Sequence, residues 1–165
     1  MNAAHYHLLL NHMPIWATIF AMAILLWGIY SKNNAIKKLA MVGFILAGVS
    51  VLAVVQSGEE AEDIVEEIAV ISHDDIEAHE DSADISKWLT IMLGIGGVAG
   101  LVMLNIGARG TRGLFWSLLL LGLITLASLS YTGYLGGQIR HAEEINASST
   151  GEATDGPDAL LQLEE

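Results

Sequence analysis

The sequence predicts an all-α fold: a bundle of four transmembrane helices, with the N-terminus and C-terminus outside and an amphipathic outer-side helix between spans two and three. Three observations support this prediction. Apolar residues make up 53% of the 165 residues and charged residues only 16%, whereas charged residues are roughly 25% of a soluble domain. Four stretches free of Lys, Arg, Asp and Glu each approach or exceed the roughly 20 residues that a helix needs to cross the membrane. Basic and acidic residues also occupy separate parts of the chain.

The charge-free stretches set the boundaries of the predicted spans. These spans are about 12–31, 39–57, 84–108 and 113–138. Each is long enough to cross a bilayer with some tilt. We interpret the first stretch as a retained helix and not as a signal peptide, because no Lys or Arg precedes it and no small-x-small cleavage site follows it. Residues 1–145 are therefore expected to form one membrane domain.

The segment between the second and third spans is expected to form an acidic helix over residues 58–73, lying on the outer end of the bundle. Three isoleucines recur there at helical spacing among carboxylates, which indicates an amphipathic helix (Ile64, Ile68 and Ile71). A further helical turn is expected to begin at Asp74 or Asp75, which are good N-cap residues. That turn should continue directly into the third span.

Charge orients the predicted bundle, because cytoplasmic loops carry the excess of Lys and Arg. Five of the seven cations fall in the first and third loops, which contain no carboxylate (Lys32, Lys37, Lys38, Arg109 and Arg112). All 19 carboxylates lie in the second loop or the tail. We therefore expect a bacterial inner-membrane protein whose acidic loop and termini lie on the periplasmic side. The tail, 146–165, has no apolar face and is expected to be disordered.

All six histidines map to the outer side of this topology. His12 opens the first span, His79 leads into the third and His141 closes the fourth. Neutral imidazole is the commonest metal ligand, and ionisable groups at a membrane boundary often mark function. A shared site at this end is therefore expected. The alternative is that each histidine is an interfacial residue bonded to water and loop backbone. The chain has no cysteine, which excludes thiolate and iron–sulfur sites.

One interpretation of the histidine cluster is a b-type haem held by imidazoles from two helices. The candidate axial pair joins His7 or His12 to His79 or His141. His7 and His12 are five residues apart, or about 140° around an ideal helix. Both can face one iron only if the turn before Pro14 is irregular.

Other residues fit the haem interpretation or a simpler one. Lys87 and Arg140, the only outer cations, are candidates to pair with haem propionates, or they extend from helix ends towards water. Glycines of the third and fourth spans either permit close helix packing or make room for a porphyrin. In the haem interpretation the chain is an electron-transfer subunit, linked to a quinone in the bilayer and to a redox protein outside.

A second interpretation is a non-haem site for zinc, iron or manganese, built from imidazoles and carboxylates. Its candidate ligands are His7, His12, His79, His141, Glu59, Glu60 and Glu80. The two glutamates of the second loop have a simpler explanation, since acids suit the positive end of a helix dipole. A third interpretation is a cofactor-free structural or pH-sensing subunit. The bilayer is the one certain partner, assembly as a homo-oligomer or in a larger complex is open, and the acidic surface argues against nucleic acid.

Four stretches of the chain resemble a family of uncharacterised bacterial four-helix membrane proteins, a domain of unknown function. His7-Leu-Leu-Leu-Asn-His-Met-Pro14 resembles its His-x4-His-Phe-Pro signature, with Met13 in place of the usual aromatic residue. The other matches are Gly58-Glu-Glu-Ala-Glu62, His79-Glu80 and the stretch from Thr132-Gly-Tyr-Leu-Gly-Gly137 to His141. No glycine follows His141, a departure from the family. Some members are fused to Rieske or cytochrome-type domains, which implies electron transfer on the outer side.

Overall fold

The computed structural model describes residues 3–65 and 73–141, with side chains described for residues 6–60, 73–139 and 141. Within these residues all regular structure is helical, and no strand occurs. The helices are α1 (Ala3–Leu10), α2 (Met13–Tyr30), α3 (Asn34–Val65), α4 (His73–Asn105) and α5 (Thr111–Arg140). Four candidate spans are long and apolar enough to cross a membrane: Tyr6–Tyr30, Asn34–Glu60, His73–Asn105 and Thr111–Ile139. The predicted all-helical fold with four membrane-length helices is confirmed.

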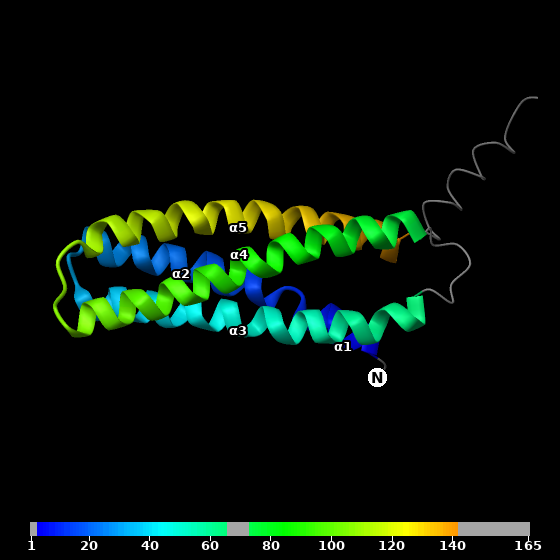
Figure 1. The fold of residues 1–165 in the computed structure, drawn as a ribbon, viewed down its shortest axis with the longest axis horizontal. Coiled ribbons are helices and arrows are strands. Elements are labelled where there is room, and N and C mark those ends of the chain that lie inside the picture. Colours follow the sequence, from blue (N-terminus) through cyan, green and yellow to red (C-terminus); the bar gives the residue numbers. More distant parts are fainter. Residues whose placement is uncertain (1–2, 66–72, 142–165) are drawn as a thin grey trace, which may run out of the picture.

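The four long helices close into a ring. Helix α3 packs against α2 and α4, and α5 packs against α4 and α2, while the short α1 lies on α3. In Figure 1 the turns joining α2 to α3 and α4 to α5 lie together at one end of the bundle. We call this the basic end, because Lys32, Arg109 and Arg112 belong to it. The opposite end, which we call the acidic end, carries α1, the start of α4 and the end of α5 (Figure 1).

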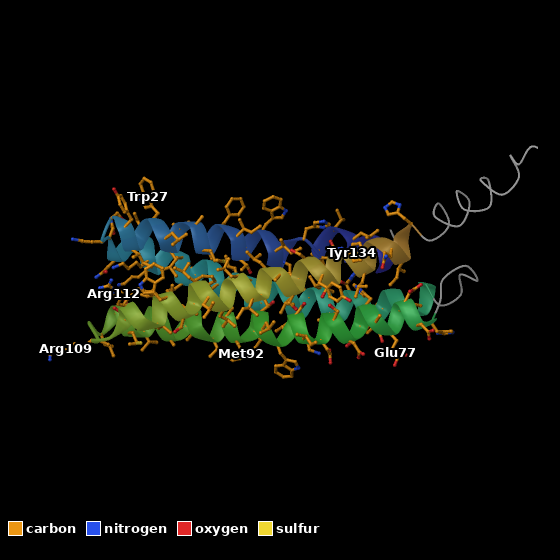
Figure 2. All side chains as sticks on the ribbon, turned by 90° about the horizontal axis from the view of Figure 1, so that it is seen from above. Trp27, Glu77, Met92, Arg109, Arg112 and Tyr134 are labelled. Atoms are coloured by element: carbon orange, nitrogen blue, oxygen red, sulfur yellow. The ribbon has the colours of Figure 1, made fainter. Side chains whose placement is uncertain are left out.

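The two ends differ in chemistry as well as in connectivity. Figure 2 shows Arg109, Arg112 and Trp27 at the basic end, and Glu77 and Tyr134 at the acidic end. Helix α4 has 33 residues and is therefore about 50 Å long, whereas the hydrocarbon layer is about 30 Å thick. Its first turns, which carry the carboxylates, extend beyond the apolar part of the bundle.

The first charge-free stretch is divided into two helices. Helix α1 ends at Leu10 and α2 begins at Met13, with a turn at Asn11 and His12 between them. Pro14 lies in the first turn of α2, a position where its missing N–H removes no helical hydrogen bond. The turn before Pro14 is thus irregular. His7 and His12 therefore do not belong to one continuous helix, and the angle of about 140° expected between them on an ideal helix does not apply.

The acidic segment after the second span differs in part from expectation. Helix α3 runs without a break to Val65, so residues 58–65 extend the second span instead of starting a separate surface helix. Glutamate and alanine are good helix formers, and no proline interrupts the segment. Residues 66–72 and the tail 146–165 lie outside the described residues. Helix α4 begins at His73 and continues unbroken into the third span, as the sequence predicts.

Glycines of the third span let α4 approach its neighbours closely. An added Cβ on Gly94 would lie 3.1 Å from the Cα of Gly48, and one on Gly97 would lie 2.7 Å from the carbonyl oxygen of Met41. An added Cβ on Gly96 would lie 2.4 Å from a methyl carbon of Leu118 in α5. Without large side chains the helix backbones come together, which is how helices associate in lipid. Packing therefore accounts for these three glycines.

Three threonines of the membrane region are buried inside the bundle. The Thr18, Thr90 and Thr125 side chains are 0% exposed, and each hydroxyl donates to the carbonyl oxygen four residues earlier, at 2.7, 2.6 and 2.8 Å. Large apolar side chains such as Trp27 and Ile95 point outward, each 64% exposed. This distribution suits a bundle surrounded by hydrocarbon, where an exposed unpaired hydroxyl is costly.

Candidate functional site

His7 is fixed at the acidic end by the outer part of α3. Its Nδ1 lies 3.2 Å from the carbonyl oxygen of Val54 and 3.3 Å from the hydroxyl of Ser57. Its ring lies against Gly58, where an added Cβ would be 3.2 Å from Cε1. A side chain at position 58 would therefore press on the imidazole. The partly buried ring is held by α3 although it belongs to α1.

His79 is held in the same way by α5. Its Nδ1 lies 3.1 Å from the carbonyl oxygen of Thr132. Its ring lies against Gly136, where an added Cβ would be 3.0 Å from Cε1 and 3.3 Å from Nδ1. The imidazole is partly buried. In both histidines, which belong to different helices, Nδ1 is hydrogen-bonded to a carbonyl of a neighbouring helix and the ring lies against a glycine of that helix.

The shared arrangement has a simple geometric basis. In each case the accepting carbonyl lies four residues before the glycine: Val54 before Gly58, and Thr132 before Gly136. In an α-helix that carbonyl already accepts the backbone N–H four residues later, but its oxygen has a second lone pair. Because glycine has no side chain, an imidazole from a neighbouring helix can lie over it and reach this lone pair.

These hydrogen bonds also determine which ring nitrogen is available. A carbonyl oxygen only accepts, so Nδ1 carries the proton in both His7 and His79. In the neutral imidazole the other nitrogen, Nε2, then has a free lone pair. Histidines that bind metals in proteins almost always donate their second N–H to a carbonyl, a carboxylate or water. In both side chains Nε2 is therefore the nitrogen with a lone pair to offer.

The two imidazoles reach the acidic end from different sides of the bundle. His7 belongs to α1, which packs on α3, whereas His79 is held by α5. The two side chains interact electrostatically. His7 with His79 is one of the axial combinations expected from the sequence.

Helix α5 leaves open space beside Gly136. An added Cβ on Gly122 would meet Met22 of α2 at 2.7 Å, whereas one on Gly133 or Gly137 would meet nothing within 4 Å. Gly133 follows Gly122 by 11 residues, which returns to the same helix face within about 20°. The face of α5 that packs on α2 at Gly122 is thus uncovered at Gly133, one turn of the helix before Gly136.

Asn11 lies one helical turn after His7, with its backbone N–H donating to the His7 carbonyl oxygen at 2.9 Å. Its Oδ1 is buried, and it has no hydrogen-bond partner among the described residues. Buried polar atoms are almost always paired, and an unpaired one needs a specific explanation. The atom points to a further polar group at this end of the bundle.

A chain of hydroxyl groups joins α4 to α5 in the helical turns of α4 that follow His79, on the side of the basic end. Ser82 and Ser86 lie 2.7 and 2.9 Å from the Thr132 hydroxyl, and Ser86 lies 2.7 Å from Ser128. Buried hydroxyl pairs of this kind fix the register of two helices, because sliding one helix would leave several of them unsatisfied. They hold the Thr132 carbonyl at the level of His79.

The other histidines with described side chains, among them the candidate ligands His12 and His141, are placed differently. His12 is exposed at the N-cap of α2, and His141 is exposed at the C-cap of α5. His73 is exposed at the start of α4. All of them lie at the acidic end, as the topology predicts, but none is seated against a glycine as His7 and His79 are.

The charged candidates whose side chains are described are partly or fully exposed. Lys87 forms an ion pair with Asp84 one turn earlier and lies over the Trp88 ring, with Nζ 5.8 Å from the ring centroid. Arg140 ends α5, and its side chain lies outside the described residues. Glu59, Glu60 and Glu80 are exposed. Within residues 3–65 and 73–141, no group of three or more His, Cys, Asp or Glu side chains could hold a metal ion.

Sequence reasoning did not identify the residues that orient the two histidines. Val54 and Thr132 act through backbone carbonyls, which no side-chain pattern reveals. Gly58 and Gly136 both belong to the motifs of the resemblance, but the sequence interprets Gly58 only together with its glutamates, and Gly136 as either a packing residue or room for a porphyrin. Their shared position, four residues after a bonded carbonyl, becomes visible only in three dimensions. No family model, curated protein or solved structure matches this chain.

Proposed function

We propose that the chain is a membrane electron-transfer subunit that binds one b-type haem at its acidic end, with His7 and His79 as the axial ligands. The observation that carries this proposal is the matched seating of the two imidazoles. The Nδ1–H of each ring donates to a helix carbonyl oxygen, at 3.2 Å in His7 and 3.1 Å in His79. The lone pair of each Nε2 is therefore left to bind the iron. Axial ligation by two imidazoles from different helices is a common way to hold a b-type haem.

The surroundings of the two histidines fit a flat apolar group with polar edges. Nothing lies within 4 Å of a Cβ added to Gly133 or Gly137 of α5, on either side of Gly136 in sequence. Asn11 has a buried side-chain oxygen without a partner among the described residues, and this acceptor could bond a protonated propionate or a water molecule. A bound haem would supply one-electron oxidation and reduction. The protein would orient the ligands through Val54 and Thr132, and their carbonyls would strengthen Nε2 as a donor by accepting the Nδ1 proton.

The resemblance to the family of four-helix membrane proteins supports the same proposal. Each of its four stretches contributes to the paired arrangement: His7 from the first, Gly58 from the second, His79 from the third and Gly136 from the fourth. If the motifs contained only residues needed for helix packing, they would not be expected to meet at two imidazoles. We therefore infer that the site is the shared feature of the resemblance.

We propose that the basic end faces the cytoplasm, because its two loops carry five cations and no carboxylate. The histidine pair would then lie near the outer surface of a bacterial inner membrane. A quinol in the bilayer is the proposed electron donor. The acceptor would be a soluble redox protein with a basic docking face, since the carboxylates of the acidic end attract cationic partners.

The test is a reduced-minus-oxidised visible spectrum of the detergent-purified protein, with iron, zinc and manganese measured on the same sample. The proposal predicts sharp bands of a reduced b-type haem and one iron per chain. A spectrum without haem bands, together with a stoichiometric amount of one metal, would show that the protein has a non-haem metal site instead of a haem. A featureless spectrum without metal, even after incubation with haemin, would leave a cofactor-free subunit.

A further inference from the structure

The basic end contains a pocket that the histidine site does not involve. It has a volume of about 340 Å³ and lies between the turn after α2 and the start of α5. Three cations line it, Lys32, Lys37 and Arg112, together with the Thr111 side chain. Among the described residues that line it there is no carboxylate. We call it the basic pocket.

Lys37 is the cation of the basic pocket whose ammonium group is held by neighbouring residues. It lies over the Phe115 ring, 5.7 Å from its centroid, and donates to the Asn34 side-chain oxygen at 3.2 Å. The backbone of Lys32 adopts a left-handed conformation, with φ of 54°, in the turn where the Asn33 N–H donates to the Gly28 carbonyl oxygen at 3.2 Å. A side chain that is already held, as Lys37 is, loses less conformational entropy on binding.

The protein supplies no negative charge to balance this cluster. Residues 31–58 and 85–142, which include both loops of the basic end, contain no Asp or Glu. Like charges gathered around one pocket repel each other unless an anion lies between them. The positive-inside rule alone explains cations in these loops, but it does not require three of them to line one pocket.

An apolar groove adjoins the basic pocket. It also has a volume of about 340 Å³, lies between α2 and α5, and is lined by Met22, Leu26 and Leu123 among other apolar residues. Trp116 lines both the groove and the basic pocket. The basic pocket and the apolar groove between α2 and α5 therefore meet at one shared side chain. A phospholipid has this arrangement of phosphate and acyl chain.

We propose that the basic pocket and the adjoining groove bind one anionic phospholipid of the leaflet at the basic end. Its phosphate would lie among Lys32, Lys37 and Arg112, and an acyl chain would follow the groove past Trp116. Basic pockets between transmembrane helices bind anionic headgroups in this way. The proposal does not depend on haem binding, because the site is at the opposite end of the bundle.

The test is native mass spectrometry of the full chain in detergent, titrated with phosphatidylglycerol or with phosphatidylcholine of the same acyl chains. We expect phosphatidylglycerol to bind at least 10-fold more tightly. Lys37→Gln combined with Arg112→Gln should weaken its binding roughly 30-fold, since each cation near a membrane surface contributes on the order of a factor of 5. Arg109→Gln is the matched control, because Arg109 belongs to the same end but does not line the pocket.

Three results would overturn the proposal. Equal affinity for the two lipids would show that the basic pocket does not select an anionic headgroup. An equal loss of affinity in Arg109→Gln would show that the overall positive charge of this end, and not the basic pocket, attracts the lipid. Glycerol 1-phosphate binding as tightly as the lipid would identify a soluble phosphate compound as the ligand, without a role for the groove. If the double variant does not fold, the single variants and the thermal stabilisation of the unmodified chain by each lipid give the same discrimination.

Discussion

His79 donates its Nδ1 proton across the α4–α5 interface to the carbonyl oxygen of Thr132, 3.1 Å away. This bond leaves the lone pair of Nε2 free, and the ring itself lies against Gly136 of α5. His7 makes the equivalent bond to Val54 at 3.2 Å, across the interface between α1 and α3. Two separate helix pairs thus present one imidazole each to the same end of the bundle, and the predictions below follow from this arrangement.

Haem content should distinguish the paired histidines from the exposed ones. We expect His7→Ala and His79→Ala each to lose most of the haem, because one axial bond is removed and the seat on the neighbouring glycine is emptied. His12→Ala and His141→Ala should retain it, since both side chains are exposed at helix caps. The measurement is the haem-to-protein ratio after purification, with membrane insertion as the control. Equal loss in all four variants would contradict the pairing.

A methyl group at Gly136 should displace the His79 ring. The added Cβ would lie 3.0 Å from Cε1, so Gly136→Ala should lower haem content or change its spectrum while the helix still forms. Gly58→Ala should act on His7 in the same way, with its Cβ 3.2 Å from Cε1.

Gly113→Ala is the control for both substitutions, because nothing lies within 4 Å of its added Cβ. It should leave the haem spectrum unchanged and stabilise the helix by about 0.5–1 kcal/mol. Unchanged spectra in both Gly58→Ala and Gly136→Ala would show that the rings are not held as described.

The hydroxyl chain should contribute to stability more than to haem binding. Thr132→Val keeps the carbonyl that orients His79 but removes the hydroxyl that bonds Ser82 and Ser86. We expect a loss of about 1–3 kcal/mol in the free energy of unfolding, measured by denaturant titration in detergent. Thr132→Ser, which keeps the hydroxyl, should recover most of it. A stability equal to that of the unmodified chain would mean that the chain of hydroxyls is not formed.

The close approach of α3 and α4 gives a test of the bundle itself. In Gly97→Ala the Cβ would lie 2.7 Å from the Met41 carbonyl oxygen, and backbone cannot move aside as a flexible side chain can. We expect a destabilisation of about 1–3 kcal/mol from overpacking, visible as a lower midpoint of thermal unfolding. An unchanged midpoint would indicate that these helices are further apart.

The membrane-length helices were predictable from the sequence because they depend on local composition. Charge-free stretches and helix formers determine them almost without reference to tertiary structure. The continuation of α4 from His73 into the third span followed from the same reasoning. The unbroken extension of α3 to Val65 was not predicted. The acidic, amphipathic pattern that suggested a new helix after Gly58 is equally compatible with a continuous helix that projects into water.

The site was predictable only in outline. Charge topology gathers all six histidines at one end, but it does not distinguish His7 from His12, since both begin the same apolar stretch. The distinction depends on the turn at Asn11 and His12, and on which helix lies beside α1. His79 was identified as a rigidly placed ligand, while its partners in α5 act through a backbone carbonyl and a missing side chain, neither of which leaves a pattern in sequence.

The central claim is that His7 and His79 together ligate one haem iron. Near-infrared magnetic circular dichroism of the oxidised, detergent-purified protein tests it most directly, because the technique identifies the axial ligands of low-spin haem. The account predicts a bis-imidazole signature that is lost in both His7→Ala and His79→Ala and kept in His12→Ala. A haem with other axial ligands, a signature that survives in His7→Ala, or a chain that binds no haem when haemin is supplied would contradict it.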